Sequence, residues 1–423
     1  MTMITAITAV ALPHLRITTL SIMRSMVLTY VLGAFILMQS SLTGVFSLFS
    51  EALAVDTIGT YLIISAFIIV SGVLSFYTSR VITTSGTPYT VVILIVIMLF
   101  GAYYLAISED MITIAVSLEI QSFSLYALTT IYRWREGATS AGLMYFMLGA
   151  FSSGLVLLGL SIVYAYTGET VFSSLGILSL LTHDRFMTVA LIMMMSGILF
   201  KVTAAPFHYW GPEVYDRVPT IITIFINIMP KFALFAFIVR FSNVLSGSDV
   251  ISYLFMSVVL SWAFGSIVGL VQTRIKRLLA YSTVSHVGWI LAAIAIGTTL
   301  GFGSFMFYLV QYSATSALTF LSLIALSLTQ VINPGKSESD VEYISSINGL
   351  YSRSVMFTLF IAITLFSAAG IPPIIGFYAK LSVMQALLYN SELMYVILGV
   401  MSSVISAGFY LSVISAMLFR VVR

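Results

Sequence analysis

Cysteine is missing from this chain of 423 residues, and charged residues make up only 8% of it. Without thiolates the chain cannot form a disulfide framework, a thiolate metal site or a cysteine-bound iron–sulfur cluster. Any redox chemistry is therefore expected on other chains, and we expect this chain to bind no cofactor. A soluble globular domain has about 25% charged residues, so water is not expected to be the main solvent of this protein.

Several functional patterns are also missing. The chain has no GxGxxG, no Walker loop, no HExxH and no Ser-His-Asp arrangement, which argues against nucleotide binding, metalloprotease chemistry and triad hydrolysis. The net charge of +3 comes from cations that are spread along the chain instead of forming a basic stripe. Nucleic acid is therefore not an expected partner.

What the chain has in abundance is apolar sequence, with 60% hydrophobic residues. A hydrocarbon core about 30 Å thick needs about 20 apolar residues for each spanning helix. The sequence predicts an all-α polytopic membrane protein, a single membrane domain over 1–423, with about 12 transmembrane helices; we interpret 1–20 as a short interfacial segment. The predicted spans are 26–48, 57–79, 88–108, 110–132, 142–166, 186–206, 218–241, 250–271, 278–300, 303–330, 353–384 and 391–419.

The distribution of Lys and Arg gives these spans an orientation. Cytoplasmic-type loops of membrane proteins carry an excess of these residues. Of the 18 cations, two, Arg185 and Arg240, lie on the side opposite the termini. Thirteen lie on the side of the termini: Arg16, Arg24, Arg80, Arg133, Arg135, Arg217, Arg274, Lys276, Arg277, Lys336, Arg353, Arg420 and Arg423. Both termini are therefore predicted to face the cytoplasm or the mitochondrial matrix.

The remaining cations, Lys201, Lys231 and Lys380, fall inside apolar spans, and so does Glu119. An ionised side chain at mid-bilayer costs at least about 2.5 to 3.5 kcal/mol on insertion scales, so each needs a partner, a wet cavity or a shifted pKa. Desolvation favours the neutral form of a lysine, whereas a nearby carboxylate favours the charged form. A movable carboxylate could thus toggle a proton. The alternative is a static ion pair between helices.

Prolines predict where spans are interrupted. Pro206 falls in the sixth span, Pro230 adjoins Lys231, and Pro372 with Pro373 splits the eleventh, which is too long for one straight crossing. Backbone groups freed at such breaks are tolerated only inside protein or beside a wet cavity. A plain packing kink is the alternative.

The interrupted spans fall at matching places in two groups of helices. Residues 88–241 contain five spans, and residues 250–419 contain five more, with the interrupted span fourth in each group. Because five is odd, the two groups have opposite orientations. Paired broken helices in inverted repeats indicate a transport site near the membrane midplane.

His286 lies a third of the way along the ninth span, in YSTVSHVGWIL. Its side chain titrates near neutral pH, so it could pass protons between lysines. A hydrogen-bonded structural histidine is the equally weighted alternative.

Three stretches carry a family resemblance: FKVTAAPFHYWGPEVYDRVPT, QTRIKRLLAYSTVSHVGWIL and SAAGIPPIIGFYAK. They resemble the antiporter-like membrane subunits of respiratory complex I, and the likeness covers about 57–419. Arg217 departs from the family, which often has Gly there. The chain also stops about one helix after Lys380, where bacterial relatives continue.

The resemblance implies a proton channel driven by quinone reduction elsewhere in the complex. It assigns Glu119 to the first half-channel and Lys201 to the lysine of the first broken helix. Lys231 matches the central connecting lysine, His286 a bridging polar position, and Lys380 the terminal lysine of the second broken helix.

The same resemblance implies partners and a location. NADH, FMN, iron–sulfur clusters and ubiquinone would belong to other subunits, and the partners would be lipids and other membrane-arm subunits, including further antiporter-like ones. The run VPTIITIFINIMPK is more similar to mitochondrial members, which predicts the mitochondrial inner membrane, with the bacterial plasma membrane as the alternative. A subunit of a multi-chain cation/proton antiporter and a purely structural scaffold remain the rival functions.

Overall fold

The computed structural model describes residues 32–33, 46–49, 51–84, 88–132, 135–181, 185–245, 249–331 and 341–420. The predicted interfacial segment, 1–20, and most of the first predicted span lie outside these residues. The prediction that this span is helical up to residue 48 is wrong. Phe46–Leu48 forms strand β1, which pairs antiparallel with β2, Leu53–Val55.

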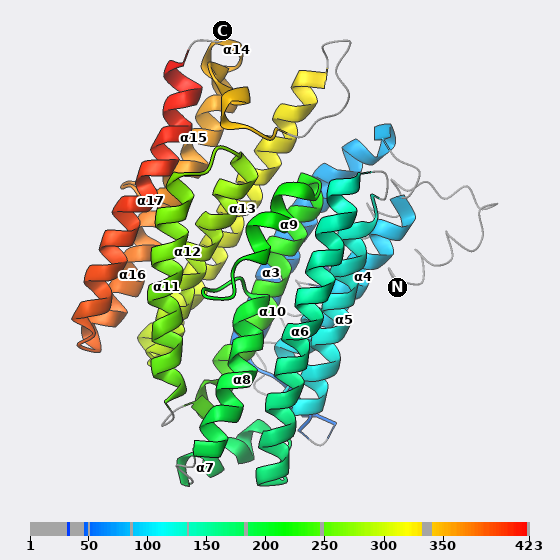
Figure 1. Cartoon of the computed structure of the whole chain (residues 1–423), viewed down its shortest axis with the longest axis vertical. Coiled ribbons are helices and arrows are strands. Elements are labelled where there is room, and N and C mark those ends of the chain that lie inside the picture. Colours follow the sequence, from blue (N-terminus) through cyan, green and yellow to red (C-terminus); the bar gives the residue numbers. More distant parts are fainter. Residues whose placement is uncertain are drawn as a thin grey trace, which may run out of the picture. The chain divides into compact units, whose positions relative to one another are not determined.

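The rest of the described chain is almost entirely helical (Figure 1). The helices are α3 Thr57–Thr84, α4 Pro88–Ile107, α5 Met111–Thr130, α6 Glu136–Thr167, α7 Phe172–Leu181, α8 Arg185–Lys201, α9 Trp210–Arg217, α10 Thr220–Leu245, α11 Val250–Leu270, α12 Ile275–Ala295, α13 Thr299–Val331, α14 Leu350–Arg353, α15 Val355–Ala369, α16 Ile375–Tyr389 and α17 Leu393–Phe419, with a 3-10 turn at Ile344–Ile347.

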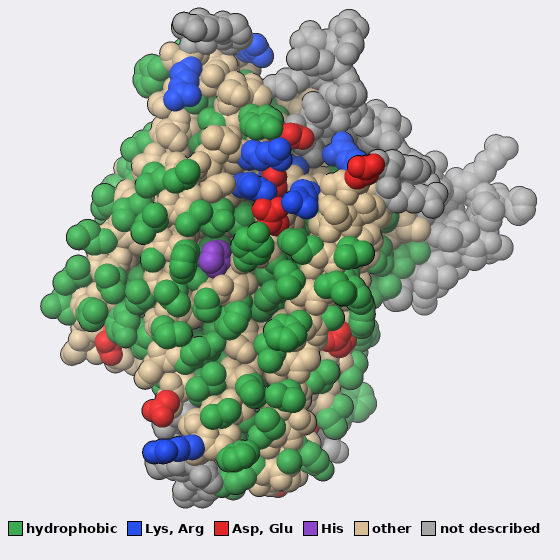
Figure 2. Space-filling model, viewed as in Figure 1, with side chains coloured by type: hydrophobic (Ala, Val, Ile, Leu, Met, Phe, Trp, Pro, Cys, Tyr) green, Lys and Arg blue, Asp and Glu red, His purple; other side chains and the backbone are tan. Residues whose placement is uncertain are grey.

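Within the described residues, nine helices are long and apolar enough to cross a membrane. They correspond to nine of the predicted spans, namely all but the first, the sixth and the eleventh. On the face shown in Figure 2, hydrophobic side chains are widespread, and charged side chains gather in a few places. The chain is therefore a multi-pass membrane protein.

The sixth and eleventh predicted spans are interrupted. Helix α8 ends at Lys201 and the short α9 begins at Trp210, so Pro206 lies in the non-helical segment between them. Likewise α15 ends at Ala369 and α16 begins at Ile375, with Pro372 and Pro373 in between. Each segment contains one cis X-Pro peptide bond.

Pro230 is different, and the prediction of a break there is corrected. Helix α10 runs through it without interruption. A proline lacks the amide hydrogen that would bond to the carbonyl four residues earlier, here Ile226. Long helices in membranes tolerate such a loss when neighbouring groups satisfy the freed carbonyl.

By contacts the chain divides into two compact units. The first contains residues 1–197 and 225–244, and the second contains 198–224 and 245–423. Helices α3, α4, α5 and α6 pack in sequence order in the first unit, whereas α11, α12, α13, α15, α16 and α17 pack together in the second. The predicted inverted repeats over 88–241 and 250–419 stay a prediction.

The tightest helix pair in the second unit is α11 against α12. A Cβ atom at Gly265 of α11 would lie 2.6 Å from the backbone nitrogen of Ser285 in α12, so only glycine permits this approach. Trp262 and Trp289 pack beside it, with ring centroids 4.9 Å apart. This contact fixes α12, the helix that carries His286.

Candidate proton-transfer site

Lys231 is buried in the middle of α10, with 2% of its surface exposed. Its Nζ donates a hydrogen bond to Oδ1 of Asn227, one helical turn earlier, at 2.5 Å. An amide oxygen is a neutral acceptor, so it satisfies the ammonium group without neutralising its charge. The site can therefore hold a proton.

Lys201 is the last residue of α8 and is half-buried. A cation in the last turn of a helix interacts favourably with the negative end of the helix dipole. The break that follows is held by contacts of other residues. The indole nitrogen of Trp210 donates to the carbonyl of Phe200 at 2.8 Å, and the amide of Ala205 donates to Oγ of Ser261 at 2.9 Å.

The backbone of this break is strained at one residue. Thr203 has φ +64°, in the left-handed region, and is buried. A β-branched residue in this conformation is a true outlier and costs of order 1 to 3 kcal/mol. The surrounding contacts must therefore hold the segment in place.

Lys380 closes the second break directly. It lies on α16 and is 5% exposed, and its Nζ donates to the carbonyl of Ala369, the last residue of α15, at 2.7 Å. Gly370 follows with φ +79°, and a Cβ atom there would lie 2.8 Å from Cδ of Lys380. The lysine thus caps one half of the helix from the other half.

His286 is buried on α12, and both of its ring nitrogens have partners. Nδ1 lies 2.8 Å from the hydroxyl of Tyr308, and Nε2 lies 3.2 Å from the hydroxyl of Tyr410. The ring also packs against Tyr312, with centroids 5.1 Å apart. The side chain of His286, in the middle of α12, is therefore held in place by residues of α13 and α17.

Glu119 is half-buried on α5 in the first unit. Lys201 belongs to the second unit, so each residue is described within its own unit. The predicted coupling of Glu119 to Lys201 stays a prediction.

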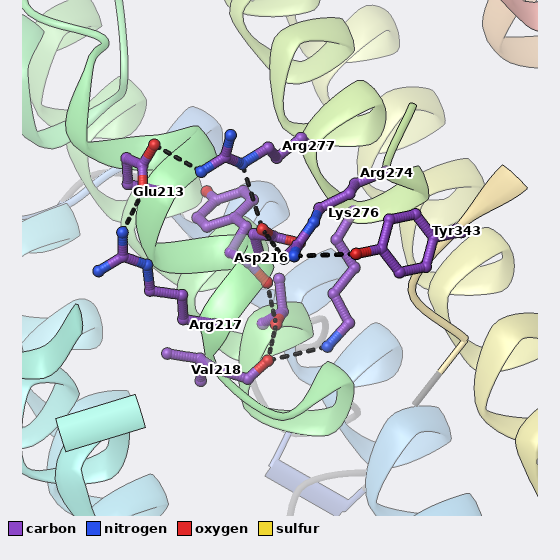
Figure 3. A network of polar contacts seen from close by, with 10 residues as sticks. Glu213, Asp216, Arg217, Val218, Arg274, Lys276, Arg277 and Tyr343 are labelled. Carbon is purple, nitrogen blue, oxygen red and sulfur yellow. Dashed lines mark hydrogen bonds and ion pairs between the residues drawn. The ribbon is translucent and has the colours of Figure 1, made fainter. Parts of the chain in front are cut away.

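A network of charges anchors α9 in the second unit (Figure 3). Asp216, whose side chain is 1% exposed, accepts a hydrogen bond from Arg274 at 2.7 Å and forms an ion pair with Nε of Arg277 at 3.1 Å. Glu213 pairs with Arg277 at 2.6 Å and with Arg217 at 2.8 Å. The network joins the short helix after the first break to the start of α12.

The charge of Asp216 also affects its partner. The hydrogen bond and the negative charge of this carboxylate raise the pKa of Arg274 above its usual value. Arg274 in addition donates to the hydroxyl of Tyr343 at 3.2 Å, and its guanidinium lies 5.2 Å from the centre of that ring. These contacts hold Arg274 in one place as a permanent cation.

Lys276 was predicted in a loop, and the structure corrects this. It lies in the first turn of α12, is 2% exposed, and donates to the carbonyl of Val218 at 3.0 Å. Val218 is the C-cap of α9, so the cation lies at the negative end of that helix. The position of Lys276 two residues before a predicted span was the one available signal of its burial.

Arg240 was predicted at the end of the seventh span, 218–241, and it lies in α10 with 5% of its side chain exposed. It pairs with Asp56 at 2.5 Å, with Glu109 at 3.5 Å, and with the carbonyl of Ala54 at 2.7 Å. Burial raises the pKa of Glu109, and the nearby charge of Arg240 opposes this shift. This cluster fastens α10 to β2 and to the loop after α4.

The geometry can be compared with known proteins. The family model described as NADH:quinone oxidoreductase/Mrp antiporter, TM, matches residues 108–406. The chain is 42% identical over 323 residues to NADH-ubiquinone oxidoreductase chain 2 of Rhizopus oryzae, which covers 75% of this chain and 62% of that relative. It is 32% identical over 379 residues to NADH-quinone oxidoreductase subunit N of Pelagibacter ubique, covering 88% and 78% respectively.

Solved structures are similar over the whole chain. One is respiratory complex I from Thermus thermophilus with bound aureothin, with a TM-score of 0.82 and 26% identity, covering 100% of this chain and 91% of that one. Another is the Mrp complex from Dietzia sp., with a TM-score of 0.83 and 19% identity, covering 100% and 79%. The second likeness concerns the fold alone.

Proposed function

Because this chain belongs to the NADH:quinone oxidoreductase/Mrp antiporter transmembrane family, we propose that it is a core membrane subunit of a proton-pumping NADH:ubiquinone oxidoreductase, the counterpart of chain 2 of that complex. The observation that carries the proposal is the placement of its lysines. Lys231 is buried in mid-helix, Lys201 ends the helix before the first break, and Lys380 spans the second.

The proposed path runs through these lysines. Protons enter from the side of the termini, load Lys201 and Lys231, pass along a hydrated polar line that includes His286, and leave by Lys380. Glu119 biases the charge of Lys201. Moving a proton against 150 to 200 mV costs about 3 to 5 kcal/mol, at about 2.3 kcal/mol per charge and 100 mV. Displacing a carboxylate near a buried lysine supplies a shift of this order.

The chain contributes proton transfer and no redox centre in this proposal. NADH, FMN, iron–sulfur clusters and ubiquinone are bound by other subunits, and the partners are lipids and membrane-arm subunits, including further antiporter-like ones. We place the protein in the mitochondrial inner membrane with its termini in the matrix, because the relative in Rhizopus oryzae, at 42% identity, is a chain of NADH-ubiquinone oxidoreductase. A bacterial plasma membrane is the alternative.

A cation/proton antiporter subunit is the second candidate, because the Mrp complex shares the fold with a TM-score of 0.83. It would have no NADH-oxidising partner, and its transport would depend on sodium. A structural scaffold is the third. Replacing both Glu119 and Lys201 by neutral residues without loss of turnover would support it.

The first test is a native gel of gently solubilised source membranes, stained for NADH oxidation, with mass spectrometry of the bands. Peptides of this chain in a very large NADH-active band are expected. Peptides in an assembly without NADH activity would favour the antiporter.

The second test is Lys231→Met, which removes a buried charge and retains an apolar side chain. It should lower the protons moved per NADH while the complex still assembles, and a normal ratio would contradict the relay.

A further inference from the structure

The imidazole of His286 is the meeting point of three helices of the second unit. Its two nitrogens contact Tyr308 of α13 and Tyr410 of α17, and both tyrosines are 1% exposed. A tyrosine hydroxyl can donate or accept a hydrogen bond. This pair of partners therefore suits both neutral tautomers of the histidine and the imidazolium ion.

The two hydrogen bonds of His286 share one direction in either neutral tautomer. With the ring proton on Nε2, Nε2 donates to the hydroxyl of Tyr410 and Nδ1 accepts from Tyr308. With the proton on Nδ1, both hydrogen bonds reverse. Oγ of Ser282 donates its only hydrogen to the carbonyl of Leu279 at 2.6 Å, so the lone pairs of this oxygen remain as acceptors.

A small cavity, lined by hydroxyl-bearing and apolar residues, lies beside this chain of hydroxyls. Ser282, His286 and Tyr410 line it together with residues of α13. The space open to the centre of a water molecule is about 20 Å³. About 10 to 15 Å³ of such space accommodates one water, which needs two to four polar partners. The cavity is therefore large enough for one water, and hydroxyl oxygens in its lining can serve as partners.

The lining offers acceptors to whatever occupies the cavity. The hydroxyls of Thr283, Thr315, Ser316 and Thr319 donate to carbonyls of their own helices at 2.7 to 3.0 Å. Their hydrogens are therefore committed, and their oxygen lone pairs remain for the occupant. A site built from oxygen acceptors favours a positively charged occupant over a neutral one.

We propose that Tyr308, His286 and Tyr410 form a proton wire that ends in this cavity, and that the cavity holds a hydrated proton. One proton arrives at the oxygen of Tyr308, whose own hydrogen passes to Nδ1. The hydrogen of Nε2 passes to Tyr410, and the hydroxyl hydrogen of Tyr410 leaves for the cavity. One proton enters and one leaves, no group changes its charge, and the histidine changes from its Nε2–H to its Nδ1–H form.

This proposal rests on the proposed function and deepens it, because it names the groups that carry the proton past His286. Tyr308 and Tyr410 touch the transferred proton, so they act in the transfer itself. Packing alone would need only their rings.

The test compares Tyr410→Phe and Tyr308→Phe with Lys231→Met in the assembled complex reconstituted in vesicles. The measured quantities are protons moved per NADH oxidised and the solvent deuterium isotope effect on turnover. Each tyrosine variant should lose the same share of protons per NADH as Lys231→Met. The double variant Lys231→Met/Tyr410→Phe should lose no more, because both residues serve one path.

The control is Tyr395→Phe, which removes a hydroxyl from α17 where the ring stacks on Phe255, with centroids 4.3 Å apart. It should keep the normal ratio and isotope effect. If Tyr410→Phe and Tyr308→Phe also keep them while Lys231→Met does not, the wire is wrong and the proposed function stands. If Lys231→Met keeps the normal ratio as well, the proposed function itself fails.

Two outcomes cover the remaining cases. If one tyrosine variant does not assemble, the other variant decides the matter by the same ratio. If turnover of the unaltered complex requires sodium and Thr283→Val removes that requirement, the cavity binds a metal cation, and the proposal of a hydrated proton is overturned.

Discussion

In the first interrupted helix the chain leaves α8 at Lys201 and turns through Thr203 in a left-handed conformation, whereas the second leaves α15 at Ala369 and turns through Gly370. Glycine adopts this conformation without strain, but a threonine does not. The first break is fixed from outside, by Ser261 of α11 and by the ion pairs of α9. The second is closed by its own Lys380.

The difference separates two ways of keeping a helix broken inside a membrane. A strained segment persists only if its surroundings hold it. The contacts that clamp α9 therefore stabilise the first break, which is a structural role separate from proton transfer. In the second break the lysine that we assign to proton release is also the group that satisfies a helix end. Its charge and the local structure are therefore linked there.

The largest expected effect is that of Asp216→Ala, which removes the centre of the α9 clamp. Removing one partner of a buried ion pair costs about 3 to 5 kcal/mol, and we expect about 2 to 4 kcal/mol here because both arginines reach solvent. The measurement is the midpoint of thermal unfolding of the detergent-solubilised assembly, followed by native gel. Asp249→Ala, an exposed aspartate before α11 with no side-chain capping bond, is the matched control. Equal midpoints for the two variants would show that the network does not clamp the break.

The next effect concerns the second break. Gly370→Ala should cost about 1 to 3 kcal/mol from the left-handed conformation, and in addition it should push Lys380 away from the carbonyl of Ala369 and lower the protons moved per NADH. Gly297→Ala is the control, because Gly297 has φ +69° and nothing within 4 Å of an added Cβ. It should show the strain without the loss of pumping. The idea of a closing lysine is excluded if both variants pump equally well.

A smaller effect is expected for Ser261→Ala, which leaves the buried amide of Ala205 without its acceptor. An unsatisfied buried donor costs about 1 to 3 kcal/mol, and relaxation of the strained segment brings the value to the low end, about 1 kcal/mol. Ser257→Ala, four residues earlier on α11, is the control, since that buried hydroxyl donates to the carbonyl of Leu254 in its own helix at 2.9 Å. Thermal midpoints that shift alike would mean that Ser261 does not hold the break.

The smallest effect is that of Arg217→Ala. Its side chain is 40% exposed and pairs with Glu213 at i,i+4. Such pairs contribute about 0.3 to 0.5 kcal/mol. We expect a barely measurable shift in the thermal midpoint that vanishes at high salt. A loss as large as that of Asp216→Ala would mean that the clamp acts as one indivisible network.

Much of the fold was predictable, because each long helix is an unbroken apolar run bounded by charged or turn-forming residues. The interruption of the eleventh span followed from its length and from Pro372 and Pro373. Burial of Lys231 and Lys380 was predictable because both lie inside apolar spans, where the side chain cannot reach water at the ends of the helix.

Other features depend on contacts that hydropathy does not encode. Pro230 does not end α10, because a helix surrounded by protein can lose one hydrogen bond and continue. Lys276 and Arg240 lie near span ends, where only the position of a partner, Val218 or Asp56, decides between burial and a loop. The partners of His286 come from helices far along the chain, so no local pattern indicated them.

The contact that closes the second break also bears on the order in which the protein is assembled. Lys380 and Ala369 are 11 residues apart, so this contact can form as soon as α16 has been synthesised. The contacts that hold the first break join residues 56 and 58 positions apart, Ala205 to Ser261 and Asp216 to Arg274. The C-terminal break can thus close within its own hairpin, whereas the earlier one must wait for α11 and α12 to enter the membrane.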